Sequence, residues 1–546
     1  MNLQTLFHTD EIPTIEEYLK RCGVEDYEHY INPPANAVEP YIKYDNIDMG
    51  VNYLERAIKL SKEHCRIVLV CDSDCDGYCA TTIAYQFLIN QGVSTHDIDI
   101  LFHEKKQHGF SPDITEQING RIDASYWGSP ISLIWVPDAG TNDVNACAYY
   151  NSAKGIPVLI TDHHVANVVN DYAIVINNQT SANVTNKNLC GAGVTHKLIT
   201  AYCKKHNSKF HQSVLDLVAL ATIGDICDMR NLENRLIVKW GLSHITNPFL
   251  SVMCETFISD SETTPTTLAW NVIPKINAVC RSNDDDLKTE LFDALAMNYY
   301  SEDFIARITK CHTKQREQTN ALYEQALAIE PIGDKVKIFE FTSTPYTGLI
   351  ANKLVEHYHC PCIVVHPNAR GEYTGSLRSP CPMRSQLEQS GLMTICAGHE
   401  QSCGVGWKVK DTEKLSTFCK QLDLTPEPKE VMYSVDNILM PKEIFEMSES
   451  GNDLWGHGIP EPTIHVSNIV ISGKDIKEIG ANKTTIKFLY GDVEFIGFFM
   501  SKEKKESLNV GKGVMMNLEI IGTPSINRFN GNEYKQIVIK EWEIEK

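Results

Sequence analysis

Three short segments rich in Asp and His each follow a run of β-branched residues. They are Asp72-Ser-Asp-Cys-Asp-Gly77, Pro137-Asp-Ala-Gly140 and Thr161-Asp-His-His164. Three carboxylates at a spacing of two residues cannot neutralise one another, so the first segment requires a cation. It does not match an EF-hand loop, because Ile83 stands at the twelfth position, where that loop needs a bidentate Glu, and because a strand precedes it.

The residues before these segments predict buried strands that alternate with helices. Short β-branched runs at 66–71, 131–136, 157–161 and 173–176 favour strands buried on both faces, and helical spacing is found over 80–90. This alternation is typical of a parallel, doubly wound α/β sheet. Ligands of such sheets bind outside the carboxyl ends of the strands, so the three segments are expected to converge there.

The converging side chains form a candidate metal centre. Four carboxylates and one imidazole are enough for two cations that share a carboxylate, and a donor set of mostly oxygen suits Mn²⁺ or Mg²⁺ better than Zn²⁺. Two such ions could activate a bridging water and hold a phosphoryl group during in-line displacement. The expected ligands are Asp74, Asp76, Asp138, His163 and Asp225, the last of which follows an apolar helix at 214–224.

The remainder of the chain divides by composition and periodicity. A polar arm (1–50) precedes the catalytic region (51–235), a helical connector (236–334), a second α/β region (335–424) and a Pro-containing linker (425–460). Residues 461–546 show five strand patterns, near 464–471, 484–490, 493–500, 514–521 and 536–544, with a hairpin signal at Asn530-Gly531. Five strands in so short a stretch are typical of a small barrel.

Composition limits the class of protein. No apolar run approaches 18 residues and the N-terminus has no basic segment before an apolar one, so we expect neither a membrane span nor a signal peptide. The 18 cysteines are then expected to be reduced thiols, and the protein to be cytoplasmic, in a host cytoplasm if a virus encodes it. A net charge of −20 argues against general adhesion to nucleic acid but leaves room for a local basic groove.

The ordered set of motifs resembles the DHH phosphoesterase superfamily and, within it, the RecJ-type single-strand-specific exonucleases. The segments 72–77, 138–140 and 162–164, with Asp225, match its four metal-site motifs. Further segments that resemble the family are Leu189-Cys-Gly-Ala-Gly-Val194, Ile273-Pro-Lys-Ile-Asn-Ala278 with Arg281, Gly375-Ser-Leu-Arg-Ser379, Ala397-Gly-His-Glu-Gln-Ser-Cys-Gly404 and Trp455-Gly-His-Gly-Ile-Pro-Glu-Pro462.

The resemblance implies a DHH phosphoesterase domain with a parallel sheet, a helical bridge, a DHH-associated α/β domain and a C-terminal OB-like barrel. It implies a monomer that uses two Mn²⁺ or Mg²⁺ ions to degrade single-stranded DNA from the 5′ end to nucleotides, in recombination or repair. Phe529 or Tyr534 could stack on bases, and Lys502, Lys504 and Lys505 could instead dock a protein partner on the barrel. The implied catalytic residues are Asp72, His164 and His399, and the implied substrate contacts are Lys105, Arg281, Arg378 and Ser379.

Several positions depart from the family pattern. Val70 stands where a histidine is usual, and Lys105 replaces an Arg ahead of Gly109-Phe110, which keeps the charge but loses the bidentate fork. The stretch 344–348 also lacks a usual histidine. Since every core carboxylate is present, we expect an active enzyme. Two alternatives stay open: a DHH phosphodiesterase of short oligonucleotides or cyclic dinucleotides, which usually lacks the barrel, and a non-catalytic replication scaffold.

Overall fold

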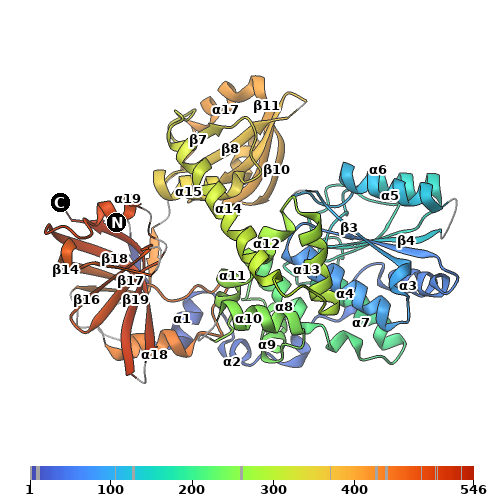
Figure 1. Ribbon diagram of the computed structural model, residues 1–546, viewed down its shortest axis with the longest axis horizontal. Coiled ribbons are helices and arrows are strands. Elements are labelled where there is room, and N and C mark those ends of the chain that lie inside the picture. Colours follow the sequence, from blue (N-terminus) through green and yellow to red (C-terminus); the bar gives the residue numbers. More distant parts are fainter. Residues whose placement is uncertain are drawn as a thin grey trace. The chain divides into compact units, whose positions relative to one another are not determined.

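The chain forms two compact units, which are described in turn. In the computed structural model, one unit contains residues 1–305 and 430–546 and the other contains residues 306–429. The structure describes residues 3–7, 13–104, 106–125, 130–258, 262–368, 370–424, 428–436, 441–480, 483–498, 500, 502–529 and 532–545. Figure 1 shows the parallel sheet and its helices in blue to green, the second unit in yellow to orange, and the C-terminal sheet in red.

The N-terminal half of the first unit is built on a five-stranded parallel sheet. Its order is β3-β2-β4-β5-β6, from β2 (Arg66–Cys71), β3 (Ile98–Phe102), β4 (Ile131–Pro137), β5 (Val158–Asp162) and β6 (Ile174–Asn177). The four predicted strands are confirmed. The additional strand β3 was not predicted, and Asp99 is the one polar residue in it. Asp99 is nevertheless buried, and the Arg66 guanidinium of the neighbouring strand pairs with it.

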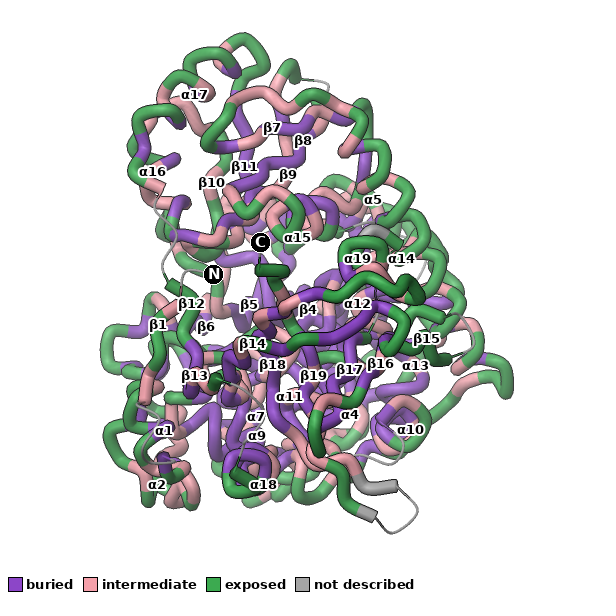
Figure 2. Tube along the Cα trace, turned by 90° about the vertical axis from the view of Figure 1, so that its left-hand side faces the viewer, coloured by how far each residue is buried: buried purple, intermediate pink, exposed green. Residues whose placement is uncertain are grey.

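Helices cover both faces of this sheet, as a doubly wound fold requires (Figure 1). One face contacts α3 (Ile47–Ser61), α4 (Cys75–Asn90) and α7 (Gly191–Lys205). The other packs against α5 (Pro112–Ser125) and α6 (Val144–Ala148) through an apolar cluster that includes Val70, Ile114 and Val136. The central strands are buried along their length (Figure 2).

Helix α4 begins at Cys75, five residues before the helical pattern indicated by the sequence. The Asp74 side chain caps it by accepting a hydrogen bond of 3.3 Å from the Gly77 amide. The acidic segment is therefore the first turn of a helix rather than a free loop. This difference matters for the chemistry, because the turn fixes the direction of Asp76.

A helical region follows the sheet, as predicted. It comprises α8 (Leu215–Gly224), α9 (Leu232–Ser243), α10 (Pro248–Phe257), α11 (Pro265–Asn271), α12 (Ile273–Cys280), α13 (Asp285–Met297) and the start of α14 (Phe304–Leu327). Helix α13 is capped by Asp284, whose side chain accepts from the Leu287 amide at 2.9 Å. Among the described helices, none is both long and apolar enough to cross a membrane.

The N-terminal arm packs on the segment that leads into the C-terminal sheet. It holds α1 (Ile15–Arg21) and α2 (Tyr27–Ile31), and β1 (Leu3–Thr5) pairs with β12 (Lys429–Val431). The Tyr18 hydroxyl donates to the Pro460 carbonyl at 3.1 Å, and the Tyr30 hydroxyl donates to the Leu454 carbonyl at 2.7 Å. This segment, within the predicted linker, carries α18 (Lys442–Ser450) and the buried Trp455.

The C-terminal sheet has seven strands. Their order is β13-β14-β18-β19-β17-β16-β15, from β13 (Tyr433–Asp436), β14 (Ile464–Ser472), β15 (Lys477–Ile479), β16 (Thr485–Tyr490), β17 (Val493–Gly497), β18 (Met515–Phe529) and β19 (Asn532–Ile544), and α19 (Lys502–Ser507) lies between β17 and β18. All five predicted strands are present. Strand β18 continues past Ile521 because a bulge there lets Gly522 and Pro524 stay in the sheet. The predicted turn Asn530-Gly531 lies outside the described residues.

The second unit contains a mixed five-stranded sheet of order β10-β11-β9-β8-β7. All five strands lie within residues 335–424, for which the sequence predicts an α/β region. The elements are β7 (Lys337–Glu340), α15 (Thr347–Tyr358), β8 (Cys362–Pro367), β9 (Glu372–Arg378), α16 (Arg384–Gln389), β10 (Met393–His399), β11 (Ser402–Lys408) and α17 (Thr412–Cys419). The core of this unit includes Trp407, Leu377 and Val405.

Candidate metal centre

The carboxyl ends of β2, β4 and β5 bring the predicted metal ligands together. These strands are adjacent in the sheet, in the order β2-β4-β5. From β2 the chain passes to β3 on one side of β2 and then to β4 on its other side. Asp138 follows β4 with φ = 72°, a left-handed conformation that Asp tolerates better than most residues. Gly191 faces it so closely that a Cβ atom there would lie 2.1 Å from Asp138 Oδ1. A glycine is therefore required at position 191.

The N-terminus of α7 fixes Asp76. The amides of Gly191 and Ala192 donate to its two carboxylate oxygens at 2.7 Å and 2.8 Å. Free amides at a helix N-terminus favour negative charge, so this contact orients an ionised carboxylate in a buried position. The glycine-rich segment found in the sequence thus supports the metal centre by close packing and by backbone hydrogen bonds.

His163 lies at the centre of the cluster. Its Nε2 atom is 3.3 Å from Asp138 Oδ1 and 3.9 Å from Asp76 Oδ2, and its Nδ1 atom is 3.6 Å from Asp225 Oδ2. Asp225 terminates α8, as the sequence indicated. Four of the five predicted ligands therefore gather here, with three carboxylates around one imidazole.

The donor atoms fall into overlapping groups whose members lie within 4.8 Å of one another. The groups are Asp76, His163 and Asp225; Asp72, Asp74 and Asp138; and Asp138, Asp162, His163 and His164. Asp138 belongs to two groups, which suits a carboxylate shared by two adjacent cations. Its Oδ1 atom is buried and has no hydrogen-bond partner among the described residues. Mostly oxygen donors with some imidazole nitrogen fit Mn²⁺ or Mg²⁺.

Electrostatics also favour a cation here. Burial and the nearby Asp76 carboxylate raise the pKa of Asp138 well above its ordinary value. Burial likewise raises the pKa of Asp76, and that of Asp225, with the neighbouring carboxylates adding to the effect. Asp74 differs: burial would raise its pKa, but the Arg281 guanidinium outweighs this and holds it below the ordinary range. Cations would relieve the repulsion among these carboxylates.

His164 forms an ion pair with the buried Asp162. Its Nδ1 atom lies 2.8 Å from Asp162 Oδ1, and the backbone amides of His163 and His164 donate to the same oxygen. Burial lowers the pKa of His164, but the hydrogen bond to Asp162 outweighs it and raises the pKa to about 10. The side chain of His164 is 46% exposed. A cationic imidazole is therefore accessible at the edge of the cluster.

Two histidines that sequence analysis did not select also surround Asp72. His108 Nδ1 lies 2.6 Å from Asp72 Oδ2, and His103 Nε2 lies 3.6 Å from Asp72 Oδ1. The rings of His108 and His164 are 5.9 Å apart. The signal that could have identified His108 is its position directly before Gly109-Phe110, in a loop already compared with the family.

Of the two predicted substrate contacts in the first unit, the structure describes Arg281. Arg281 lies at the rim of the cluster, with one terminal nitrogen 3.6 Å from Asp74 Oδ2 and its Nε atom donating to the Ser73 carbonyl at 3.3 Å. Asn277, from the same motif, accepts from the Cys75 amide at 2.9 Å and so holds the start of α4. Lys105 lies outside the described residues.

The other predicted contacts lie in the second unit, at one end of its sheet. Ser402 of β11 is the register partner of both Arg378 on β9 and His399 on β10, so these two residues lie on either side of the same strand end. His399 is exposed. The Ser379 hydroxyl donates to the Cys381 carbonyl at 2.6 Å. Ser379 thus stabilises the turn after β9.

A parallel sheet with Asp and His at successive strand ends, together with a second α/β unit and a C-terminal sheet, is the arrangement that the resemblance to DHH phosphoesterases implies. Family models agree: residues 66–222 match the DHH family, N-terminal domain, and residues 446–541 match the RecJ OB domain. The chain is thus similar to RecJ proteins in both of these regions.

Individual relatives give the same result. The chain is 26% identical to the "Putative single-strand DNA-specific exonuclease yorK" of Bacillus phage SPbeta, covering 98% of this chain and 96% of that protein. It is 25% identical to the single-stranded-DNA-specific exonuclease RecJ of Escherichia coli, covering 78% of each. The structure of RecJ from Thermus thermophilus in complex with Mn²⁺ superposes with a TM-score of 0.73 at 17% identity, over 97% of this chain and 75% of that one, which supports the shared fold.

Proposed function

We propose that this protein is a metal-dependent exonuclease that hydrolyses single-stranded DNA to nucleotides, proceeding from the 5′ end. The observation that carries the proposal is the arrangement around His163, where carboxylates from the first turn of α4 and from the ends of β4 and α8 meet at the carboxyl edge of a parallel sheet. The names of the relatives support the choice of substrate. The 5′ polarity rests on the resemblance to RecJ-type enzymes.

Two Mn²⁺ or Mg²⁺ ions would be held by Asp76, His163 and Asp225 on one side and by Asp72 and Asp74 on the other, with Asp138 between them. When bound, such ions activate water and stabilise the charge that develops on a phosphoryl group. The chain's own contribution is to fix these ligands on strand ends and helix termini. Rigid placement of charge before reaction is the main source of electrostatic catalysis.

The other residues would bind and orient the strand. His164, held as a cation by Asp162, presents an N–H group to a phosphate at the rim of the cluster. Arg281 adds a second positive charge there. We assign Arg378 and His399 to contacts with the terminal phosphate and the scissile group. Ser379 instead stabilises the turn that follows Arg378 at the end of β9, because its hydroxyl donates to the Cys381 carbonyl.

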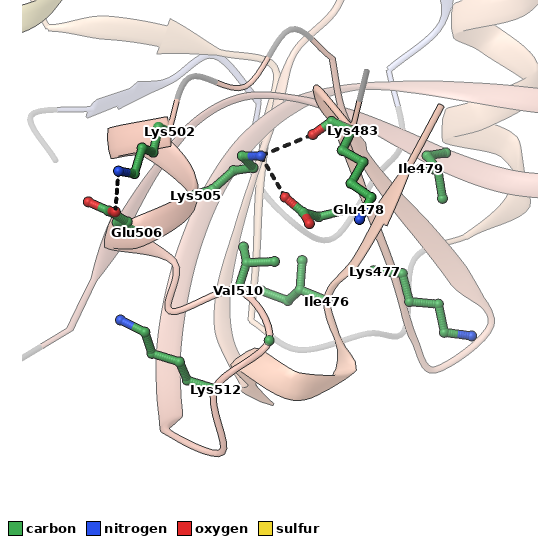
Figure 3. Close-up of a pocket in the computed structure, with 11 residues that line it drawn as sticks. Ile476, Lys477, Glu478, Ile479, Lys483, Lys502, Lys505, Glu506, Val510 and Lys512 are labelled. Atoms are coloured by element: carbon green, nitrogen blue, oxygen red, sulfur yellow. Dashed lines mark hydrogen bonds and ion pairs between the residues drawn. The ribbon is translucent and has the colours of Figure 1, made fainter. Parts of the chain in front are cut away.

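The C-terminal sheet offers a local basic surface on an acidic protein. A hollow of about 610 Å³ between β15 and α19 is lined by five lysines and two glutamates (Figure 3): Lys477, Lys483, Lys502, Lys505, Lys512, Glu478 and Glu506. Lys505 pairs with Glu478 at 2.5 Å, and the lysines exceed the glutamates by three. We propose that this basic hollow contacts the phosphates of the strand, and that the exposed Tyr534 stacks on a base.

The same surface could dock a protein partner, with Lys502, Lys504 and Lys505 on α19 as its contacts. Binding titrations with long single strands at several salt concentrations separate the two proposals, because phosphate contacts steepen the salt dependence. We further propose that the protein acts as a monomer in the cytoplasm, in that of a host if a phage encodes it.

The substrate class is tested by offering the purified protein four substrates with Mn²⁺: a long single strand, the matching duplex, a dinucleotide and a cyclic dinucleotide. The proposal expects mononucleotides from the long single strand and little from the duplex. Hydrolysis confined to the dinucleotides would replace it with the short-substrate phosphodiesterase. Strand binding without hydrolysis of any substrate would favour the non-catalytic scaffold.

A further inference from the structure

Ile226, which directly follows the predicted metal ligand Asp225, has a backbone conformation that isoleucine rarely adopts. Its φ angle is 55°, in the left-handed region. There the Cβ atom of an L-residue crowds the following carbonyl oxygen, and β-branched side chains are tolerated least. Ten non-glycine residues in the described part of the chain have a positive φ angle. The other nine are asparagine, histidine, aspartate or lysine, so Ile226 is the one β-branched residue among them.

The end of helix α8 requires this left-handed conformation. The Cys227 amide donates to the Thr222 carbonyl at 3.0 Å. The Ile226 amide donates to the Ile223 carbonyl at 3.2 Å. These two hydrogen bonds form a Schellman motif, in which the residue at the position of Ile226 is usually glycine because glycine adopts a positive φ without strain. The backbone alone would therefore favour glycine at this position.

Helix α7 ends in the same way with a residue type that the motif prefers. Asn207 follows its C-terminal cap with φ = 55°, and the Ser208 amide donates to the Cys203 carbonyl at 2.8 Å. Asparagine tolerates the left-handed region better than most residues. The end of α7 carries none of the predicted site residues, and its sequence follows the usual preference. The end of α8 departs from that preference directly beside the metal centre.

Packing in the core does not account for the isoleucine. Ile226 is 54% exposed, whereas the next residue, Cys227, is 3% exposed. A side chain that strains the backbone and leaves most of its surface in water contributes little to the stability of the fold. Departures of this kind occur mainly where the strained residue takes part in binding or catalysis. The isoleucine is therefore expected to contact a molecule that binds at this surface.

The position of Ile226 indicates which molecule that is. Asp225 Oδ2 lies 3.6 Å from His163 Nδ1 at the metal centre, and consecutive Cα atoms are about 3.8 Å apart. A second β-branched residue, Val165, directly follows His164 and is 66% exposed. Its carbonyl oxygen accepts from the Asn142 side-chain amide at 2.9 Å, which holds it in place. Exposed aliphatic residues thus follow two of the metal-site motifs.

The substrate of the proposed reaction has apolar groups at the corresponding place. A phosphodiester at the metal centre is bonded through its oxygen atoms to two sugars. These sugars are the first uncharged groups on either side of the phosphate, and their carbon–hydrogen faces are apolar. Burying such a face against an aliphatic side chain is favourable, and burying it against a carboxylate is not. An isoleucine next to a metal ligand is therefore suited to a sugar.

We propose that Ile226 is a substrate-binding residue whose side chain packs on the sugar of a nucleotide next to the scissile phosphate. The inference rests on the proposed nuclease function and adds to it a contact that does not depend on base sequence. It also gives a reason for isoleucine at a position where glycine suits the backbone better, since the side chain is needed by the strand and not by the fold.

The test compares Ile226→Gly with the wild type in three measurements on the full-length protein. The melting temperature in EDTA should equal or exceed that of the wild type, because glycine relieves the left-handed strain. Mn²⁺ affinity, measured by electron paramagnetic resonance, should be unchanged because Asp225 is retained. Affinity for a short single strand, measured by fluorescence anisotropy with Ca²⁺ in place of Mn²⁺, should fall about five- to tenfold, the scale of burying part of an isoleucine side chain.

Two control variants and a modified strand sharpen the test. Ile226→Val keeps an aliphatic β-branched side chain and should keep most of the strand affinity. Asn207→Ile places isoleucine at the equivalent position of α7, so it should lower the melting temperature and leave strand affinity unchanged. A strand whose 5′-terminal nucleotides are abasic keeps its sugars without their bases, and the loss caused by Ile226→Gly should be the same on it.

Wild-type strand affinity in Ile226→Gly would overturn the inference. So would a melting temperature below that of the wild type, because the side chain would then be needed by the fold. A loss of affinity that disappears on the abasic strand would show that Ile226 contacts a base, and the sugar assignment would be wrong. Hydrolysis of the normal strand by the wild type is measured separately. Its absence would refute the proposed nuclease function, whereas the binding measurements would still decide whether Ile226 contacts the strand.

Discussion

Replacing Asp138 with Asn should make the metal-free protein more stable while abolishing its activity. Asp138 shares a group of carboxylates with Asp72 and Asp74 whose donor atoms lie within 4.8 Å of one another. One pair of like charges at that distance costs about 3.5 kcal/mol at an effective dielectric constant of 20. Because the raised pKa of Asp138 lets it take up a proton, part of this cost is avoided. We therefore expect Asp138→Asn to gain about 1–3 kcal/mol in EDTA at pH 8.

The sign of the pH dependence follows from the same shift. A carboxyl group whose folded-state pKa lies above its unfolded value destabilises the folded protein as the pH rises from about 4 through the folded pKa. In EDTA the wild type should thus lose stability over this range, and Asp138→Asn should lose less. Excess Mn²⁺ at about a hundred times its Kd should stabilise the wild type by about 2.7 kcal/mol per site and the variant by much less.

Urea unfolding of both proteins, with and without Mn²⁺, measures these differences. Asp216→Asn is the matched control, since Asp216 is equally buried but accepts hydrogen bonds from the amides of Thr246 and Asn247 at 2.7 Å and 2.6 Å. Its replacement should lower stability in both conditions. An Asp138→Asn protein less stable than the wild type in EDTA would show that the cluster is not held under repulsion, and the reasoning would fail.

Further outcomes are expected elsewhere. Asp76→Ala should lower turnover at least about a thousandfold, the scale of losing a main electrostatic contribution, whereas near-normal turnover in the presence of EDTA would exclude the two-metal proposal. Arg378→Ala should weaken binding of 5′-phosphorylated strands more than of 5′-hydroxyl strands, by roughly 1.5–3 kcal/mol in competition titrations, and equal losses would remove its assignment to the terminal phosphate. In EDTA, the stabilisation from the His164–Asp162 pair should be complete below about pH 6.5 and lost as the pH rises toward about 10, so a wild-type stability advantage over His164→Gln that does not shrink over this range would contradict the assigned ion pair. Lys477→Glu combined with Lys512→Glu should flatten the salt dependence of long-strand binding, while the same charge change at Lys59 and Lys62 near the end of α3 should not.

The strand-end chemistry could be predicted from the sequence because each part of it is local. A short β-branched run followed by Asp predicts both a buried strand and a carboxylate at its end, and three such runs in order define a shared edge. Residue type alone does not place the cap of α13, since Asn283 and Asp284 are equally good caps by type and the structure uses Asp284.

Other features depend on contacts that sequence order does not reveal. His108 lies 36 residues from Asp72, and the two meet only because β3 is placed beside β2 rather than after β6. Strand β9 was also hidden, because glycines within a strand resemble those of a loop. Gly375 is needed there since a Cβ atom would lie 1.9 Å from the Val364 carbonyl oxygen. Such packing constraints appear only once the strands are adjacent.

The most direct test of the central claim follows single strands labelled at the 5′ or the 3′ end during incubation with Mn²⁺. The two-metal exonuclease proposal predicts that the 5′ label is released at once as a mononucleotide, that the 3′-labelled strand shortens progressively, and that EDTA or Asp76→Ala stops both. Undiminished release in EDTA, or no release from any strand by a protein shown to bind two Mn²⁺ ions, would contradict it.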